Sequence, residues 1–285
     1  MANAPLVSVV LPAYNAERFL SEAVRSVRRQ TFRHLDIIVV NDGSTDGTGA
    51  VAGQLAEEDS RVRVVHTRNA GLSAARNVGI AEARGEFICF LDADDIFLHD
   101  KIERQLAFLE ALPSCDLVYS DHYLGDELLN PILLECKRPP APLSELLSYC
   151  NWFAPMAALM KTHLLRGVGG FDEELKSAED WDMWIRAARV AVLAYLPGPV
   201  GIYRTHPGQM HRNLARMRAY QDKVIRKHFA HGGKEWHITQ AARAWSNAKR
   251  AWAASNYVTS AASLATVVWH ARSRRTLRKV VQLAY

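Results

Sequence analysis

The chain has 285 residues, a formal net charge of +5 and 49% apolar residues, which is ordinary for a globular protein with one large domain and an appendage. No stretch reaches about 18 consecutive apolar residues, so we expect no membrane span, and we expect no signal peptide. The four cysteines form no CxxC pair, which argues against a zinc site and favours a reducing, cytoplasmic setting.

Charge is distributed unevenly along the chain. Residues 210–285 contain 15 Lys and Arg against 2 Asp and Glu, whereas the preceding residues contain 20 basic and 28 acidic side chains. A basic segment favours phosphate-bearing partners such as an anionic membrane surface, and the acidic first part argues against nucleic acid as a partner of the whole chain. Alternatively, the basic segment packs as a helical subdomain around Trp236, Trp245 and Trp252.

Apolar runs of strand length alternate with helical spacing in the first part of the chain. We expect strands at residues 6–12, 35–40, 61–66, 87–91 and 116–120, separated by helices that end near residues 30, 58, 83 and 112. This alternation predicts an α/β protein with a mixed, mostly parallel sheet flanked by helices. The chain lacks the GxGxxG and GxxxxGK[ST] motifs, so a nucleotide would be bound by another device.

The later part of the chain is less regular. We expect a Pro-rich surface loop over 130–142, short helices over 143–150 and 162–168, and a strand or apolar segment over 153–160. A helix over 177–190, strands over 191–196 and 200–204, and further helices complete the pattern. These expectations divide the chain into a domain of residues 1–206 and a basic helical region of residues 207–285.

Three carboxylates, Asp92, Asp94 and Asp95, directly follow an apolar run of strand length. Carboxylates this close repel one another and are stable only when they are hydrated, protonated or neutralised by a cation. Mg²⁺ and Mn²⁺ prefer oxygen ligands and often share them with substrate phosphates. The stretch therefore predicts a metal site at a strand end. The alternative is an acidic turn in which Asp94 or Asp95 caps the next helix.

Two further acidic positions are expected near the same edge of the sheet: Asp42 after the second strand, and Glu179–Asp180 at the start of a helix. Parallel strands deliver their carboxyl ends to one crevice, where open α/β sheets bind ligands. Asp42 could accept a hydrogen bond from a base or ribose, although a single Asp at a strand end is more often a turn residue. Tyr14 could offer its ring to a base, and Arg76 could contact a diphosphate.

Asp180 opens a helix whose buried stripe includes Trp181 and Trp184. Acids in a first turn interact favourably with the helix dipole, which also keeps Asp180 ionised and able to accept a proton from an attacking hydroxyl. An aromatic ring beside it suits the apolar face of a sugar, but core packing is the alternative and the one we prefer for Trp184. His206 could supply a neutral imidazole to a metal, although a lone His is more often not a ligand.

These motifs, in this order, resemble those of the family 2 glycosyltransferases of the GT-A fold, over residues 5–206. Each stretch is weak alone, and the match rests on all of them: VSVVLPAYN at 7–15, VVNDGSTD at 39–46, NAGLSAARN at 69–77, FLDADD at 90–95, GGFD at 169–172 and EDW at 179–181. The resemblance implies transfer of a sugar from a nucleotide diphosphate donor, usually with inversion at the anomeric carbon.

The resemblance also implies roles for individual residues. The donor nucleotide would be bound by Pro12, Tyr14, Asn15, Asp42, Arg76 and Asp92. Mn²⁺ or Mg²⁺ would be bound by Asp94, with Asp95 in support and His206 as a further ligand. Asp180 would be the general base, and Glu179 and Trp181 would face the acceptor.

The expected donor is a UDP-sugar, and the expected acceptor is a hydroxyl of a glycan or a lipid-linked molecule. By analogy with the family, the setting is polysaccharide biosynthesis by a cytoplasmic enzyme, peripheral at the inner face of the cell membrane. One alternative is a sugar-phosphate nucleotidyltransferase, which would carry a Gly-rich, basic loop where this chain has residues 12–17. Another is a non-catalytic membrane adaptor that acts through the basic segment.

Overall fold

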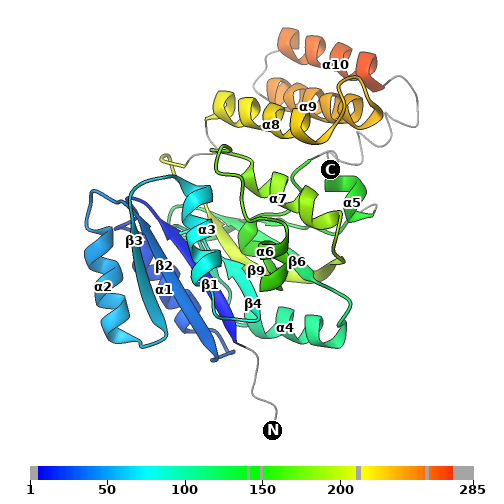
Figure 1. Ribbon diagram of the computed structural model, residues 1–285. Helices are drawn as coiled ribbons and strands as arrows, with labels where there is room; N and C mark the ends of the chain where they lie inside the picture. Colours follow the sequence, from blue (N-terminus) through cyan, green and yellow to red (C-terminus); the bar gives the residue numbers. More distant parts are fainter. Residues whose placement is uncertain (1–5, 140–141, 148–149, 210–212, 254–256, 272–285) are drawn as a thin grey trace.

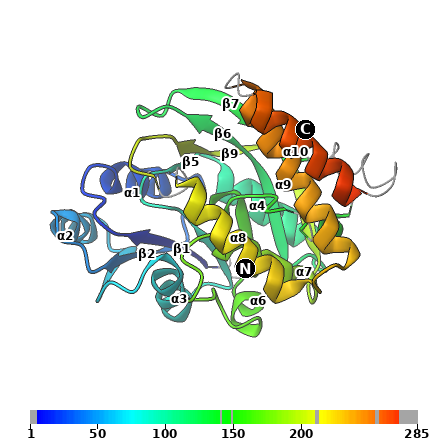
Figure 2. The same ribbon diagram turned by 90° about the horizontal axis from the view of Figure 1, so that it is seen from above.

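The computed structural model describes residues 6–139, 142–147, 150–209, 213–253 and 257–271. A single curled sheet is flanked by helices on both faces (Figure 1). The helices of residues 214–228, 234–253 and 257–271 lie together beyond one end of the sheet in Figure 1, and Figure 2 looks down on them from that end.

The described strands form a nine-stranded sheet in the order β3–β2–β1–β4–β8–β6–β9–β5, with β7 beside β6. Their bounds are β1 Val7–Ala13, β2 Leu35–Asp42, β3 Val62–Thr67, β4 Phe87–Phe90, β5 Ile96–Phe97, β6 Leu117–Gly125, β7 Pro131–Glu135, β8 Ala158–Lys161 and β9 Leu193–Arg204. Strands β1 to β4 run parallel, as do β6 and β9, whereas β5, β7 and β8 run antiparallel to their neighbours. The predicted mixed α/β sheet is confirmed.

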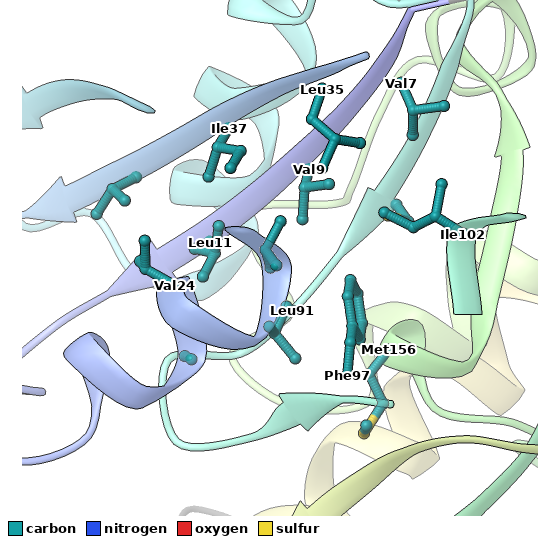
Figure 3. Packing of buried hydrophobic residues seen from close by; sticks show 14 of the residues in the cluster. Val7, Val9, Leu11, Val24, Leu35, Ile37, Leu91, Phe97, Ile102 and Met156 are labelled. Carbon is teal, nitrogen blue, oxygen red and sulfur yellow. The ribbon is translucent and has the colours of Figure 1, made fainter. Parts of the chain in front are cut away.

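Helices cover both faces because consecutive residues of a strand point to opposite sides. On β1, Val9 and Leu11 pack on the side of α1 (Leu20–Arg28), α2 (Thr48–Glu58) and α4 (Lys101–Ala111), as Figure 3 shows for part of this cluster. Val10 packs on the other side, with α3 (Leu72–Glu82), α6 (Thr162–Gly167) and α7 (Glu179–Ala188). Burial on both faces explains why the strand is apolar apart from Ser8, whose hydroxyl donates a hydrogen bond to the Asp36 carboxylate.

The expectation of a surface loop over residues 130–142 was wrong in part, because Pro131–Glu135 forms β7 and pairs with β6. The Asp126 carboxylate builds the intervening turn by accepting hydrogen bonds from the backbone N–H groups of Leu128 and Asn130, both at 2.9 Å. Pro131 is tolerated since it begins an edge strand, where a missing N–H costs little. Residues 140–141 of the expected loop lie outside the described residues.

Other elements differ from expectation in their extent. The strands expected over 191–196 and 200–204 are one strand, β9, whose register against β6 shifts after Ser120. The buried Asp121 carboxylate accepts the N–H of Gly198 and the hydroxyl of Tyr195, each at 2.9 Å, and so holds this irregular stretch. The helix expected over 143–150 is α5 (Leu143–Leu147), and residues 148–149 lie outside the described part of the chain.

The described chain after residue 213 is helical, as expected, with α8 (Leu214–His228), α9 (Lys234–Ala253) and α10 (Tyr257–Ala271). Helix α8 inserts Val224 and Ile225 into the apolar cluster that contains α7. Trp252 is 65% exposed and does not belong to a helical core. None of the described helices is long and apolar enough to cross a membrane. Helices α9 and α10 pack around a small cluster of their own, Ile238, Ala241, Ala244 and Val267.

Candidate active site

A cleft of about 550 Å³ opens at the carboxyl ends of β1 and β4, beside the start of α7. Open α/β sheets bind their ligands at this edge. Most of the predicted site residues line the cleft: Pro12, Tyr14, Asn15, Asp92, Asp94, Glu179, Asp180 and His206. The remaining predicted residues are buried and do not line it: Asp42, Arg76, Asp95 and Trp181.

Arg76 joins two acidic parts of the cleft. Its guanidinium is 1% exposed and donates hydrogen bonds to Glu179 at 2.6 Å and to Asp92 at 2.7 Å. Burial alone would lower the pKa of Arg76, but the charges of Asp92 and Glu179 outweigh it and raise the pKa above its ordinary value. The network fixes the start of α7 against the end of β4, so Arg76 orients two carboxylates of the cleft wall.

Asp42 holds the loop that leads into α3. Its carboxylate accepts hydrogen bonds from the backbone N–H groups of Ala70 and Gly71, each at 2.9 Å. Gly71 has a φ of 96°, a left-handed conformation that glycine adopts without strain. Asp42 is the last residue of β2, and its carboxylate holds this loop; its predicted contact with the donor nucleotide stays a prediction.

The turn after β4 gives Asp94 and Asp95 different surroundings. Asp94 lines the cleft, and its Oδ2 lies 3.0 Å from Nε2 of His206. Asp95 is 1% exposed and accepts the backbone N–H of Arg204 at 2.9 Å. Burial, and then the charges of Asp94 and Asp92, raise the pKa of Asp95 well above its ordinary value. Asp95 therefore ties β9 to the turn from inside the protein.

The structure distinguishes between the two roles considered for the turn after β4, a helix cap and a metal site. The helix-cap alternative fails, because β5 follows the turn and α4 begins only at Lys101. Asp94 and His206 present a carboxylate and an imidazole side by side at the cleft. Among the described residues, no group of three or more His, Cys, Asp or Glu side chains is arranged to hold a metal. A carboxylate and an imidazole are groups that bind divalent cations, so the pair could hold a cation whose other ligands come from a bound diphosphate and water.

Asp180 lines the cleft from the first turn of α7. Its Oδ2 accepts a hydrogen bond from Asn151 Nδ2 at 2.7 Å, and its Oδ1 accepts one from the backbone N–H of Trp181 at 2.8 Å. Burial and the charge of Glu179 raise the pKa of Asp180 to about 7, against the opposing effects of Asn151 and Arg76. The expectation that Asp180 stays ionised therefore holds only above this pKa, and a carboxylate whose pKa lies near neutral pH suits a general base.

Two residues other than glycine have a left-handed backbone in the cleft wall. Ala178, directly before α7, has a φ of 59°, and Asn15, after β1, has a φ of 49°. The side-chain oxygen of Asn15 accepts a hydrogen bond from the backbone N–H of Thr45 at 2.8 Å. The backbone N–H of Asn15 donates a hydrogen bond to Oγ of Ser44 at 3.0 Å. Such conformations persist where the surrounding structure imposes them, and they concentrate at functional sites.

One wall of the cleft contains residues that the sequence did not reveal. Trp152 donates a hydrogen bond from Nε1 to the backbone carbonyl of Lys137 at 2.8 Å, and its ring is half-buried. Trp181, the expected acceptor contact, is instead 2% exposed, and its Nε1 donates to the Leu147 carbonyl in the core. This wall combines His122 from β6 with Lys137, Asn151 and Trp152 from irregular segments, so no regular spacing in the sequence predicts it.

Comparison with known proteins identifies the family. The model of "Glycosyl transferase family 2" matches residues 8–134. An uncharacterised glycosyltransferase of Haemophilus influenzae is 30% identical over 226 residues, which are 73% of this chain and 68% of the relative. The uncharacterised glycosyltransferase EpsJ of Bacillus subtilis is 33% identical over 217 residues, which are 72% of this chain and 63% of EpsJ. The chain belongs to glycosyl transferase family 2.

Solved glycosyltransferase structures share the fold. TarS of S. aureus, residues 1–349 in complex with UDP-GlcNAc, has a TM-score of 0.62 at 19% identity, over 89% of each chain. The mannosyltransferase PcManGT of Pyrobaculum calidifontis, in complex with GDP-Man and Mn²⁺, has a TM-score of 0.64 at 22% identity, over 99% of this chain and 80% of that one. The curled α/β sheet flanked by helices is therefore an architecture that glycosyltransferases use.

Proposed function

We propose that this glycosyltransferase moves a sugar from a UDP-sugar to a hydroxyl of a glycan or lipid-linked acceptor, with inversion and with a divalent cation. One observation carries the proposal: a single cleft contains both the Asp94–His206 pair and the carboxylate of Asp180. The complexes of TarS with UDP-GlcNAc and of PcManGT with GDP-Man and Mn²⁺ support a nucleotide-sugar donor and a metal.

The donor nucleoside would lie against the end of β1. Tyr14 is 52% exposed at the cleft and offers a ring face for stacking on a base. Pro12 and the constrained Asn15 shape the same wall. Asp92, oriented by Arg76, would accept a hydrogen bond from a ribose hydroxyl, as the family resemblance implies.

Asp94 and His206 would hold Mn²⁺ or Mg²⁺ at the donor diphosphate. When bound, the cation neutralises the negative charge that develops on the departing nucleoside diphosphate. Asp95 supports this arrangement indirectly, because its bond to the backbone of Arg204 fixes the turn relative to β9, the strand that leads to His206.

Asp180 would accept the proton of the acceptor hydroxyl while the hydroxyl oxygen bonds to the anomeric carbon and the bond to the diphosphate oxygen breaks. Attack on the face away from the leaving group inverts the anomeric carbon. The hydrogen bonds from Asn151 and from the Trp181 backbone hold the carboxylate during this transfer. The half-buried ring of Trp152 offers a surface for the acceptor sugar.

A donor screen tests the function and the metal together. Release of a nucleoside diphosphate is measured for a panel of nucleotide sugars with and without Mn²⁺. We expect release from a UDP-sugar, its loss in EDTA and its return with Mn²⁺ or Mg²⁺. Full activity in EDTA would refute the metal, and pyrophosphate release from a nucleoside triphosphate and a sugar phosphate would indicate a nucleotidyltransferase instead.

The Asp180→Asn variant tests the base. Because the amide cannot accept the proton, we expect kcat to fall by about 100-fold or more. The affinity for UDP, measured by calorimetry, should stay within the range of the parent protein. Asp100→Asn, at an exposed carboxylate before α4, is the matched control. Normal turnover in Asp180→Asn would exclude Asp180 as the base.

We further propose a cytoplasmic location with peripheral association at an anionic membrane surface. The excess of basic residues in the segment 210–285 and the exposure of Trp252 and Trp269, at 65% and 61%, support this proposal. Co-sedimentation with anionic vesicles should be strong at low salt, weaken as salt rises, and be absent with neutral vesicles. Failure to bind at low salt would contradict it.

A further inference from the structure

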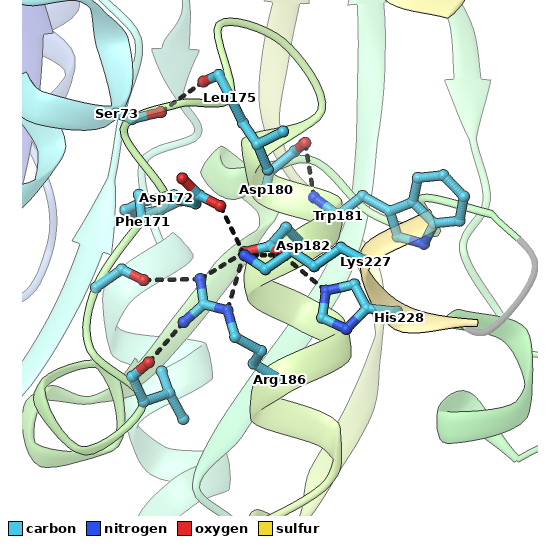
Figure 4. Close-up of polar contacts among 12 residues, drawn as sticks. Ser73, Phe171, Asp172, Leu175, Asp180, Trp181, Asp182, Arg186, Lys227 and His228 are labelled. Carbon is cyan, nitrogen blue, oxygen red and sulfur yellow. Dashed lines mark hydrogen bonds and ion pairs between the residues drawn. The ribbon is translucent and has the colours of Figure 1, made fainter. Parts of the chain in front are cut away.

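Asp182 lies two residues beyond Asp180 on α7, and its side chain is 0% exposed. Three side chains surround its carboxylate, as Figure 4 shows: the cationic Arg186 at 2.7 Å and Lys227 at 2.8 Å, and the imidazole of His228 at 2.7 Å. Burial alone would raise the pKa of Asp182, but its hydrogen bonds to His228 and Lys227 and the charge of Arg186 hold it well below its ordinary value. The carboxylate is therefore ionised, and Nε2 of His228 donates to it.

The partners of Asp182 come from different parts of the fold. Arg186 belongs to α7 and also donates to the backbone carbonyls of Val168 and Gly170, at 2.6 and 2.8 Å. Lys227 and His228 belong to α8, and they are here called the α8 latch. The α8 latch connects the C-terminal region to the helix that carries Asp180.

Lys227 gives the α8 latch a second attachment. Its Nζ pairs with Asp172 at 2.6 Å in addition to Asp182. Burial acts to lower the pKa of Lys227, yet its hydrogen bonds to Asp172 and Asp182 raise that pKa above the ordinary value. One ammonium group thus joins α7, α8 and the loop after α6.

The latch restrains rotation of α7 about its axis. Residues two apart on a helix are separated by about 200° around it, so Asp180 and Asp182 face nearly opposite directions. Turning α7 would move the Asp182 carboxylate away from the α8 latch and leave a buried charge without its partners, which is strongly unfavourable. Holding Asp182 therefore also holds the direction in which Asp180 points.

The N-terminal end of α8 also contacts the surroundings of Asp180. Arg216 donates a hydrogen bond from Nη2 to the backbone carbonyl of Lys176, at 2.7 Å, in the loop before α7. Met217 lines the cleft itself. Helix α8 is thus attached to the chain on both sides of Asp180.

We propose that Lys227 and His228 are positioning residues that hold Asp180 in the orientation needed for proton transfer. The α8 helix is then part of the catalytic unit, even though it lies beyond the region in which the family motifs occur. This inference rests on the proposed role of Asp180 as the general base.

Steady-state kinetics of three α8 variants of the full chain test the proposal. His228→Leu removes the donor, whereas His228→Gln places an amide N–H at a similar reach and should restore it. Lys227→Met removes the bridging charge at a side chain that is 39% exposed, so it perturbs folding less. Lys223→Met is the matched control, because Lys223 is exposed on the same helix and contacts the ring of Tyr220.

We expect His228→Leu and Lys227→Met to lower kcat by about tenfold or more, as a small misplacement of a catalytic group does. The donor KM and the affinity for UDP should change less than twofold, His228→Gln should recover most of the kcat, and Lys223→Met should match the parent. Unchanged kcat in both latch variants would overturn the proposal. So would a parallel loss of kcat, UDP affinity and thermal stability that His228→Gln does not relieve, since that pattern reflects structure alone. An unaltered protein that releases no nucleoside diphosphate would instead refute the proposed function.

Discussion

Asn151 is the residue through which the acidity of Asp180 can be changed without touching the carboxylate. Its Nδ2 donates to Asp180 Oδ2 at 2.7 Å, and this bond favours the ionised form. The other groups that act on Asp180 are the charges of Glu179 and Arg76 and the backbone N–H of Trp181. Because a general base works only when ionised, activity should rise with pH through the pKa of about 7.

The Asn151→Ala variant should move the acid limb of the kcat/KM profile to higher pH, since losing the hydrogen bond raises the pKa of Asp180 further. Activity at pH 6 should fall more than activity at pH 8.5. Asn130→Ala, in the turn before β7, serves as the control, because Asn130 bonds only to its own turn among the described contacts. If the acid limb of Asn151→Ala stays in place or moves to lower pH, the hydrogen bond from Asn151 does not lower the pKa of Asp180.

The side-chain environments at the cleft were only partly predictable from the sequence. Apolar runs reveal where parallel strands end, so Asp92, Asp94 and Asp42 could be placed at one edge of the sheet. Whether such a residue faces the cleft or the interior depends on contacts between segments far apart in the chain. Asp95 is turned inward by the backbone of Arg204, and no local pattern reports that contact.

At the scale of elements, the packing of α3 on β1 depends on a glycine. A Cβ at Gly79 would lie 2.2 Å from Cγ1 of Val10, a buried side chain in the middle of the strand. Helix α3 would have to move away from the sheet, and it carries Arg76. We expect Gly79→Ala to destabilise the protein by about 1–3 kcal/mol, as overpacking does. Thermal unfolding should show a lower Tm, and sugar transfer should decrease with it.

Gly53→Ala in α2 is the matched control, since nothing lies within 4 Å of its added Cβ. Alanine favours the helix over glycine by about 1 kcal/mol, so the Tm of this variant should rise. If both variants shift the Tm in the same direction, close packing at Gly79 is not what limits the approach of α3 to β1.

Elements with a clear period were predictable, and elements defined by long-range pairing were not. Strands β1 and β2 were predictable from their apolar runs, because helices cover both faces of each strand. β7 was mistaken for a loop, because Ile132, Leu133 and Leu134 are exposed and their pairing with β6 gives no alternating pattern. The two halves of β9 appeared separate because Pro197 to Pro199 interrupt a strand that the ladder with β6 keeps continuous.

At the scale of the whole molecule, the C-terminal helices differ in what they bury. Helix α8 shares the cluster of α7 through Val224 and Ile225 and supplies the α8 latch. Helices α9 and α10 bury mainly each other. However, Trp236 on α9 packs against the apolar cluster that contains α7, and Arg243 on α9 pairs with Asp222 on α8. The family motifs end near residue 206. The contacts of α8 with α7 nevertheless favour a functional boundary after α8.

Two shortened chains distinguish these boundaries. A chain that ends at Gly233 keeps α8, so it should unfold cooperatively, bind UDP and transfer sugar within a few-fold of the full chain. A chain that ends at Gln209 loses Val224 and Ile225 from the core and leaves Asp182 without Lys227 and His228, so its transfer rate should fall by about tenfold or more. Circular dichroism on heating, calorimetry with UDP and nucleoside diphosphate release measure the three properties. Equal activity of the two chains would place the boundary near residue 206, and loss of activity in both would extend the catalytic unit to α9 and α10.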